Sequence, residues 1–142
     1  MTKPEMRTRF GICIVICHLA LFSLIFVYYV LGGFTLDEML TSLGLMAPMF
    51  ASFVGIVVDE YTDSPQSSAP TLTTTLQLRG GFVFLSWLFL ASYTVFMATI
   101  IVLRSHNIGI KTFEAFKVLV AVGETACGIY LARFVKSLFE KS

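Results

Sequence analysis

Glu124 is the residue whose type and position point most clearly to chemistry. It lies in the apolar run Val118–Tyr130, where an ionised carboxylate at the centre of a membrane helix costs roughly 2.5–3.5 kcal/mol on insertion scales. Such a side chain usually faces the interior of a bundle, a cavity or a partner. Two interpretations stay open. Glu124 lines an ion path or relays protons, or it is a protonated carboxyl that bonds to another helix and fixes the packing.

His18 is the second candidate. At 1.5 Å per residue, His18 and Glu124 lie ~12 and ~18 Å from the same side of a membrane, so they could pair within one protomer or between subunits. A pair of this kind can sense pH. The alternative is a neutral imidazole bonded to a helix carbonyl or to a serine.

Lys117 shares a helical face with Glu124. Residues three and four apart lie on one side of a helix, and this spacing places Glu114, Lys117, Ala121, Glu124 and Gly128 on one stripe. Gly123, Ala126 and Gly128 are small enough to let another helix approach closely. We therefore predict that the stripe faces protein and that Lys117 and Glu124 belong to the same polar contact or ion path.

The remaining reactive side chains predict neither a metal site nor an enzyme. Cys13, Cys17 and Cys127 all lie in apolar runs, where a free cysteine behaves as a small hydrophobic residue. Cys13 and Cys17 share a helical face, but His18 points about 100° away and no fourth ligand is near. The sequence has no Gly-rich phosphate loop, no Ser/His/Asp set and no carboxylate pair at hydrolase spacing. We expect no catalytic residue, no metal and no cofactor.

The elements that position these residues follow from composition. The chain has 142 residues, of which 56% are hydrophobic and 13% are charged, against about 45–50% and about 25% in soluble domains. Lipid is the natural solvent for such a chain, and a net charge of +1 excludes an electrostatic nucleic-acid binder. Four apolar segments are each long enough to cross about 30 Å of hydrocarbon, and each crossing must be helical. We predict an all-α integral membrane bundle with helices at about 4–31, 36–60, 75–104 and 112–139.

Local signals place the ends of these helices. Thr35 and Glu38 form a capping box after the Gly32-Gly33 break, whereas Asn107 and Gly109 end the third helix and Thr112 caps the fourth. We expect a mobile loop over 61–72. Residues 71–78 read either as a short strand or as the first turns of the third helix, and the helix is favoured because a lone strand has no partner.

Pro48 interrupts the second helix. A proline inside a helix removes one backbone hydrogen bond and kinks the helix. Ser52 or a water could satisfy the carbonyl that is freed. The kink is either a gate hinge or a feature of packing.

Lysine and arginine placement sets the orientation. With four spans, seven of the ten Lys and Arg residues lie on the side of the termini and three on the other, which predicts that both termini are cytoplasmic. A re-entrant second segment would nearly remove this bias. Six charged residues are candidate cytoplasmic contacts to a partner or to lipid: Asp59, Glu60, Asp63, Arg79, Arg133 and Lys136. Arg133 and Lys136 suit anionic lipids, or they only determine topology.

The layout resembles the small four-pass membrane subunits of bacterial anti-phage defence systems, such as the Kiwa membrane subunit or the Rex B-type proteins of lambdoid phages. The likeness covers the whole chain and rests on three features: the span kinked at Ala47-Pro48, the link to the third span, and the fourth span with Gly123-Glu124-Thr125 and Gly128-Ile129-Tyr130. The resemblance implies a membrane sensor or depolarising effector that is oligomeric and works with a cytosolic partner.

These observations lead to two functional hypotheses. The first is a small oligomeric inner-membrane protein, a dimer or tetramer, that alters membrane permeability in anti-phage defence. The alternative is a non-conducting scaffold or anchor that recruits a cytosolic protein through the Asp59–Arg79 connection and the termini. A transporter or intramembrane enzyme fits less well, because the chain is small for alternating access unless it forms an inverted dimer.

Overall fold

The protein is an all-helical bundle. A computed structural model describes residues 3–62 and 80–139, and these form α1 (Lys3–Val30), α2 (Leu36–Thr62), α3 (Gly80–Ser105) and α4 (Phe113–Phe139). The observed ends lie within two residues of the predicted ones where both are described. Tyr61 and Thr62, predicted to begin the mobile loop, continue α2. The rest of that loop, the predicted start of the third helix at residue 75, and all of 71–78 lie outside the described residues.

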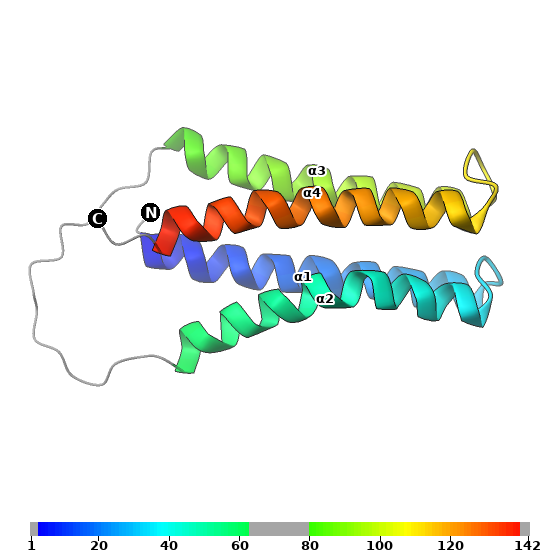
Figure 1. Cartoon of the computed structure of the whole chain (residues 1–142), viewed down its shortest axis with the longest axis horizontal. Helices are drawn as coiled ribbons and strands as arrows, with labels where there is room; N and C mark the ends of the chain where they lie inside the picture. The colour runs from blue at the N-terminus through cyan, green and yellow to red at the C-terminus, as the bar shows by residue number, and fades with distance from the viewer. Residues whose placement is uncertain (1–2, 63–79, 140–142) are drawn as a thin grey trace, which may run out of the picture.

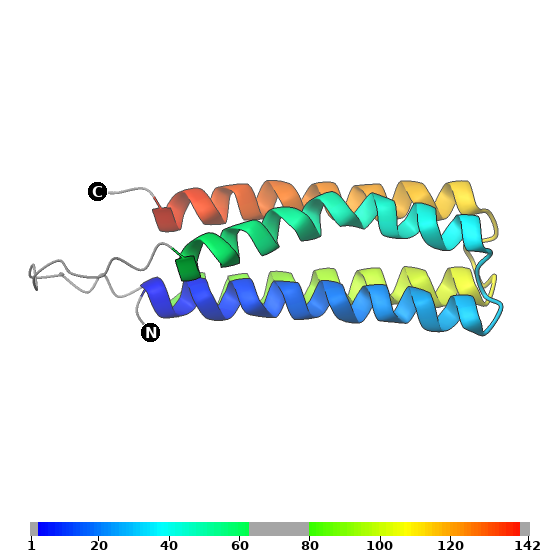
Figure 2. The same cartoon turned by 90° about the horizontal axis from the view of Figure 1, so that it is seen from below.

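The four helices lie side by side along one long axis. α1 and α2 form one antiparallel hairpin and α3 and α4 form another, so both connections lie at one end and Lys3 and Phe139 lie at the other (Figure 1). The view from below shows α1 and α3 in one layer and α2 and α4 in the second (Figure 2). Each helix packs against two neighbours, which places α1 diagonally opposite α4. Consequently α2 and α3 each contact both α1 and α4.

The predicted ends of the helices beside the two described connections are confirmed. The Thr35 hydroxyl accepts from the Glu38 amide at 3.3 Å and Glu38 Oε2 accepts from the Thr35 amide at 3.0 Å, which is the predicted capping box. The Thr112 hydroxyl caps α4 by accepting from the Ala115 amide. Gly32 and Asn107 follow α1 and α3 with φ values of 80° and 54°. At each of these positions a pair of backbone hydrogen bonds closes the helix end in a Schellman motif.

Most of the surface along the helices is apolar. Within residues 3–62 and 80–139, three helices contain a span long and apolar enough to cross a membrane, namely Arg9–Val30, Leu36–Gly55 and Val83–Ser105, and only 22–33% of each span is buried inside the bundle. Val30, Phe84 and Val95 are each at least 65% exposed. Apolar surface on this scale is costly in water and natural in lipid.

α2 bends near Pro48, as the sequence predicts. Its C-terminal half leans away from α1 toward the end of the bundle that carries Lys3 (Figure 1). The expected role of Ser52 is wrong. Its hydroxyl donates to the carbonyl of Pro48 itself at 2.8 Å, whereas the missing proline N–H leaves the carbonyl of Gly44, four residues earlier, without its helical donor.

Candidate functional site

Three polar side chains meet inside the bundle, one from each of three helices. The hydroxyl of Tyr93 on α3 donates to Oε1 of Glu124 on α4 at 2.6 Å. The same hydroxyl lies 3.2 Å from Nε2 of His18 on α1. His18 is fully buried, and Tyr93 and Glu124 are 6% and 8% exposed. We call these residues the Glu124–Tyr93–His18 chain.

The imidazole of His18 is anchored at its other nitrogen. Nδ1 lies 3.0 Å from the carbonyl oxygen of Ile14, one turn earlier in α1. The rings of Phe50 and Phe53 on α2 lie 6.2 Å from the imidazole, centroid to centroid, and the ring of Tyr93 lies at 5.6 Å. Side chains of α2 and α3 therefore surround the imidazole, and together with the Ile14 carbonyl of α1 they fix its ring orientation.

The Glu124 carboxyl has one bonded and one unbonded oxygen. Oε2 is buried and has no hydrogen-bond partner among the described residues. An ionised carboxylate with an unpaired buried oxygen is costly unless a compensating charge lies nearby. The group is therefore stable either as the neutral acid or as the anion of a pair that has a cation close by.

Two glycines beside Glu124 let other helices approach it. A Cβ added at Gly123 would lie 2.9 Å from the Met97 sulfur of α3, and one added at Gly128 would lie 2.7 Å from the Met49 methyl of α2. The predicted close approach at these two glycines is confirmed. Ala121 and Ala126, however, are exposed.

Lys117 lies apart from the Glu124–Tyr93–His18 chain. Its ammonium pairs with Glu114 at 2.7 Å and lies 5.6 Å from the centre of the Phe113 ring, within the first turns of α4. Seven residues separate it from Glu124, which corresponds to ~10 Å along a helix. Lys117 does not contact the buried carboxyl.

Tyr93 is the member of the chain that the sequence analysis missed. A direct pair of His18 and Glu124 was one of two interpretations of His18, but in the part of the bundle that the structure describes the two residues are joined through the Tyr93 hydroxyl. The bond from His18 to a helix carbonyl, which was the alternative for this residue, is also present. The available signal was a tyrosine in the middle of an apolar segment, away from the ends where aromatic belts lie.

A second polar contact joins α3 and α4 nearer the end of the bundle that carries Lys3. The Tyr130 hydroxyl donates to the Ser86 hydroxyl at 3.0 Å, and the Tyr130 ring stacks on Phe89 with centroids 3.9 Å apart. Ser86 is fully buried. The seam between α3 and α4 thus carries polar contacts at two levels.

An ion pair lies at the opposite end, beside the two connections. Arg104, near the end of α3, donates to Glu38 Oε1 and to Asn107 Oδ1, each at 2.5 Å. Glu38 is also the acidic member of the capping box of α2. Gly33 approaches the backbone of Ser105 so closely that an added Cβ would lie 3.1 Å from its carbonyl oxygen. The α1–α2 connection and the end of α3 therefore pack directly against each other.

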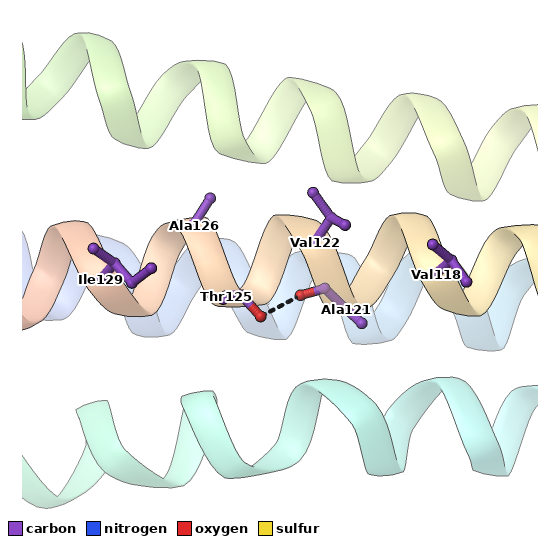
Figure 3. A pocket seen from close by; sticks show the side chains of 6 residues that line it. All are labelled: Val118, Ala121, Val122, Thr125, Ala126 and Ile129. Carbon is purple, nitrogen blue, oxygen red and sulfur yellow. Dashed lines mark hydrogen bonds between the residues drawn. The ribbon is translucent and has the colours of Figure 1, made fainter.

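The outward face of α4 carries a shallow groove of about 460 Å³. Figure 3 shows α4 between α3 and α2, with the side chains that line the groove: Val118, Ala121, Val122, Thr125, Ala126 and Ile129. The Thr125 hydroxyl donates to the Ala121 carbonyl at 2.7 Å, so the groove presents no free polar side chain. Its surface is suited to lipid chains and is separate from Glu124.

The other candidate residues are less well described. Asp59 and Glu60 belong to α2, and Arg133 and Lys136 to α4, but their side chains lie outside the described part of the chain, as do Asp63 and Arg79 altogether. Cys13, Cys17 and Cys127 are free thiols. Among the described residues, no three His, Cys, Asp or Glu side chains converge as metal ligands would.

Comparisons with protein-family models, with curated proteins and with solved structures found no match to this chain. The functional interpretation therefore depends on the geometry of the bundle itself.

Proposed function

We propose that this chain is a multi-pass protein of the inner (plasma) membrane with four crossings and both termini in the cytoplasm. Three helices have the length and apolar character that a crossing needs. α4 lies beside α2 and α3 along the bundle, and its outward residues Val118, Val122 and Ile129 are each at least 58% exposed. If α4 is the fourth crossing, these exposed apolar side chains lie in lipid and not in water.

We further propose that the protein alters membrane permeability, as a sensor and effector that opens an ion path through its polar interior. The observation that carries this proposal is the Glu124–Tyr93–His18 chain, which joins three helices at the middle of the bundle. Ionisable residues are expensive within a membrane, and those present usually lie on ion or proton pathways. A purely structural bundle of this size needs no buried glutamate and histidine.

Self-association into a dimer or tetramer completes the proposal. The interior of the bundle is filled by side chains such as Met46, Met97 and Ile101, each 0% exposed. An open path therefore requires that helices of one protomer separate, and contacts between protomers can stabilise that state. Native mass spectrometry of the protein extracted in mild detergent measures the subunit number, and a monomer alone would contradict this part.

Ion flux into proteoliposomes tests the permeability function. The full chain is reconstituted, a potential of either sign or a pH gradient is applied, and H⁺ and K⁺ fluxes are recorded with entrapped dyes. We expect the wild type to raise at least one flux above that of protein-free vesicles. Glu124→Gln should lower it by roughly tenfold or more, because the substitution removes the ionisable group from the path.

Glu114→Gln is the matched control, because the Glu114 side chain is 80% exposed and lies outside the bundle interior. It should retain the wild-type flux. Wild-type vesicles that show no flux under any of these gradients would overturn the permeability function, and retention of a cytosolic partner by such a protein would favour a scaffold.

The anti-phage role is tested in bacteria. Because a depolarising effector acts on the membrane of the infected cell, expression should reduce phage plating and infection should be followed by loss of membrane potential in a dye assay. Glu124→Gln should abolish both effects. Equal plating efficiency with and without the gene, across a panel of phages, would contradict a defence role. It would not contradict the permeability function, which the flux assay tests separately.

A further inference from the structure

We propose that the Glu124–Tyr93–His18 chain is a proton relay, and that the ion which this bundle passes is the proton. This inference rests on the proposed permeability function and specifies its ion. It starts from the hydrogen-bonding capacity of each atom in the chain.

The carbonyl of Ile14 fixes one proton. A carbonyl oxygen can only accept a hydrogen bond, so His18 Nδ1, at 3.0 Å, must carry a hydrogen and donate it. The neutral form of His18 then has an unprotonated Nε2. That nitrogen lies 3.2 Å from the Tyr93 hydroxyl, which has a single hydrogen to share between Nε2 and Glu124 Oε1.

Two proton arrangements satisfy every contact in the chain. In the neutral arrangement Glu124 is a carboxylic acid that donates to the Tyr93 oxygen, and Tyr93 donates to Nε2 of His18. In the charge-separated arrangement Tyr93 donates to the Glu124 carboxylate, and the imidazolium of His18 donates from Nε2 to the Tyr93 oxygen. The other two arrangements are less favourable. A carboxylate with a neutral His18 leaves Nε2 without a donor and the buried anion without a cation, and a carboxylic acid with an imidazolium leaves a buried cation without an anion.

Interconversion of the two arrangements balances without any external reactant. The Glu124 proton moves to the Tyr93 oxygen while the Tyr93 proton moves to His18 Nε2. One O–H bond breaks and one forms at the tyrosine, and the chain keeps the same total number of protons. The result carries one unit of positive charge from α4 to α1 across heavy-atom separations of 2.6 and 3.2 Å.

The surroundings are suited to such a transfer. The Phe50 and Phe53 rings lie against the imidazole, and Met97 lies against Gly123, the residue that precedes Glu124. Neither arrangement leaves an uncompensated charge, which an apolar interior would penalise heavily. The transfer therefore moves one proton equivalent from Glu124 to His18 inside the bundle.

The relay continues toward the cytoplasmic end through the Tyr130–Ser86 pair. Tyr130 lies six residues beyond Glu124 on α4 and bonds to Ser86 on α3, which places this pair ~9 Å further along the bundle axis. That step is too long for direct transfer, so water must enter between the two levels. The bend of α2 after Pro48 lies toward this same end of the bundle (Figure 2).

Tyr93→Phe tests the relay, because it removes one hydroxyl and keeps the ring. In proteoliposomes clamped with K⁺ and valinomycin, we expect the variant to lower proton flux by roughly tenfold or more, a size typical of losing a proton-transfer group. Tyr28→Phe is the matched control, since Tyr28 lies outside the chain and contacts the exposed His106 ring. Circular dichroism and size-exclusion profiles verify that each variant is folded.

Nitrogen-15 NMR of the histidine ring gives a readout that does not depend on flux. The protein has two histidines, His18 and His106. The substitution His106→Gln therefore leaves His18 as the single labelled imidazole. We expect a protonated Nδ1, and an Nε2 signal shifted from that of a free neutral nitrogen by exchange between the two arrangements. Glu124→Gln, which cannot supply the proton, should return Nε2 to the neutral position.

The outcomes separate the two proposals. Flux of K⁺ that equals or exceeds that of H⁺ and survives Tyr93→Phe would overturn the relay and leave the permeability function intact. The Nε2 signal is compared between His106→Gln and the double variant His106→Gln/Glu124→Gln. Identical signals in these two proteins would also overturn the relay. No flux of any ion would overturn the permeability function and, with it, the relay as a transport path.

Discussion

Arg104 and Glu38 form the best-connected ion pair in the described part of the molecule. Their side chains keep 11% and 16% exposure, and the carboxylate also accepts from the Thr35 amide. Pairs that are largely withdrawn from water are costly to break, because the remaining charge is left without a partner. The pair thus joins the start of α2 to the end of α3, across the two connections.

Arg104→Met should lower the free energy of unfolding by about 2 kcal/mol, since it leaves Glu38 charged and only slightly solvated. Unfolding in mixed detergent micelles, followed by circular dichroism, measures this loss. Adding Glu38→Gln removes the unpaired charge and should restore part of the stability. If the loss of unfolding free energy in the double variant equals the sum of the losses in Arg104→Met and Glu38→Gln, the two side chains do not interact.

The sequence identifies the ionisable members of the candidate site but not the residue that joins them. Glu124 and His18 stand out because ionisable groups are rare in apolar segments. Tyr93 gives a weaker signal, because a tyrosine carries no charge at neutral pH and its role depends on α3 lying beside both α1 and α4. No periodicity within one helix reports which helices are neighbours. Lys117 was placed with Glu124 for the same reason, through a shared stripe on α4 alone.

At the scale of the helix, capping and bending are predictable because they are local. The capping box at Thr35 and Glu38, the Thr112 cap and the left-handed Asn107 each depend on residues within one turn. The buried face of α4 is not local. Phe116, Val120 and Cys127 form it together with Glu124, so the face is rotated by about 100° from the predicted stripe. Apolar residues occur on every side of α4. The hydrophobic pattern of its sequence therefore does not identify which face is buried.

Pro48→Ala should straighten α2. The substitution supplies the N–H that the Gly44 carbonyl lacks and removes the clash of the proline ring with the preceding turn. Spin labels at the exposed positions 12 and 55, in a chain whose cysteines are replaced by alanine, report the separation of α1 and the C-terminal half of α2. We expect a shorter and narrower distance distribution in the variant.

A label pair at the exposed positions 31 and 40 is the control for this experiment, because it lies on the connection side of Pro48. Its distance should not change. Equal distributions at positions 12 and 55 in both proteins would mean that packing, and not the proline, bends α2. Proton flux measured on the same variant then tests the hinge interpretation, which predicts a reduced flux when α2 is straight.

At the scale of the whole molecule, the up-and-down arrangement favours an even number of crossings for the membrane bundle that we propose. Lys3 and Phe139 lie at one end of the bundle and both connections lie at the other. A protein in which only α1, α2 and α3 crossed would have to detach α4 from the bundle. Detachment would expose the buried side chains Phe116 and Val120, both 0% exposed, at about 25 cal/mol for each Å² of apolar surface. It would also separate Glu124 from Tyr93.

Epitope tags therefore provide a direct test of topology. One tag is placed at each terminus and one in the second connection at Ile108, which is 61% exposed. In inverted inner-membrane vesicles, added protease should remove both terminal tags and spare the tag at Ile108; in spheroplasts the pattern should be reversed. Terminal tags on opposite faces would mean that α4 stays outside the bilayer, and the Glu124–Tyr93–His18 chain could not then form within the membrane. Because the positive-inside bias and the packing of α4 are independent observations, agreement of the tags with both would establish four crossings.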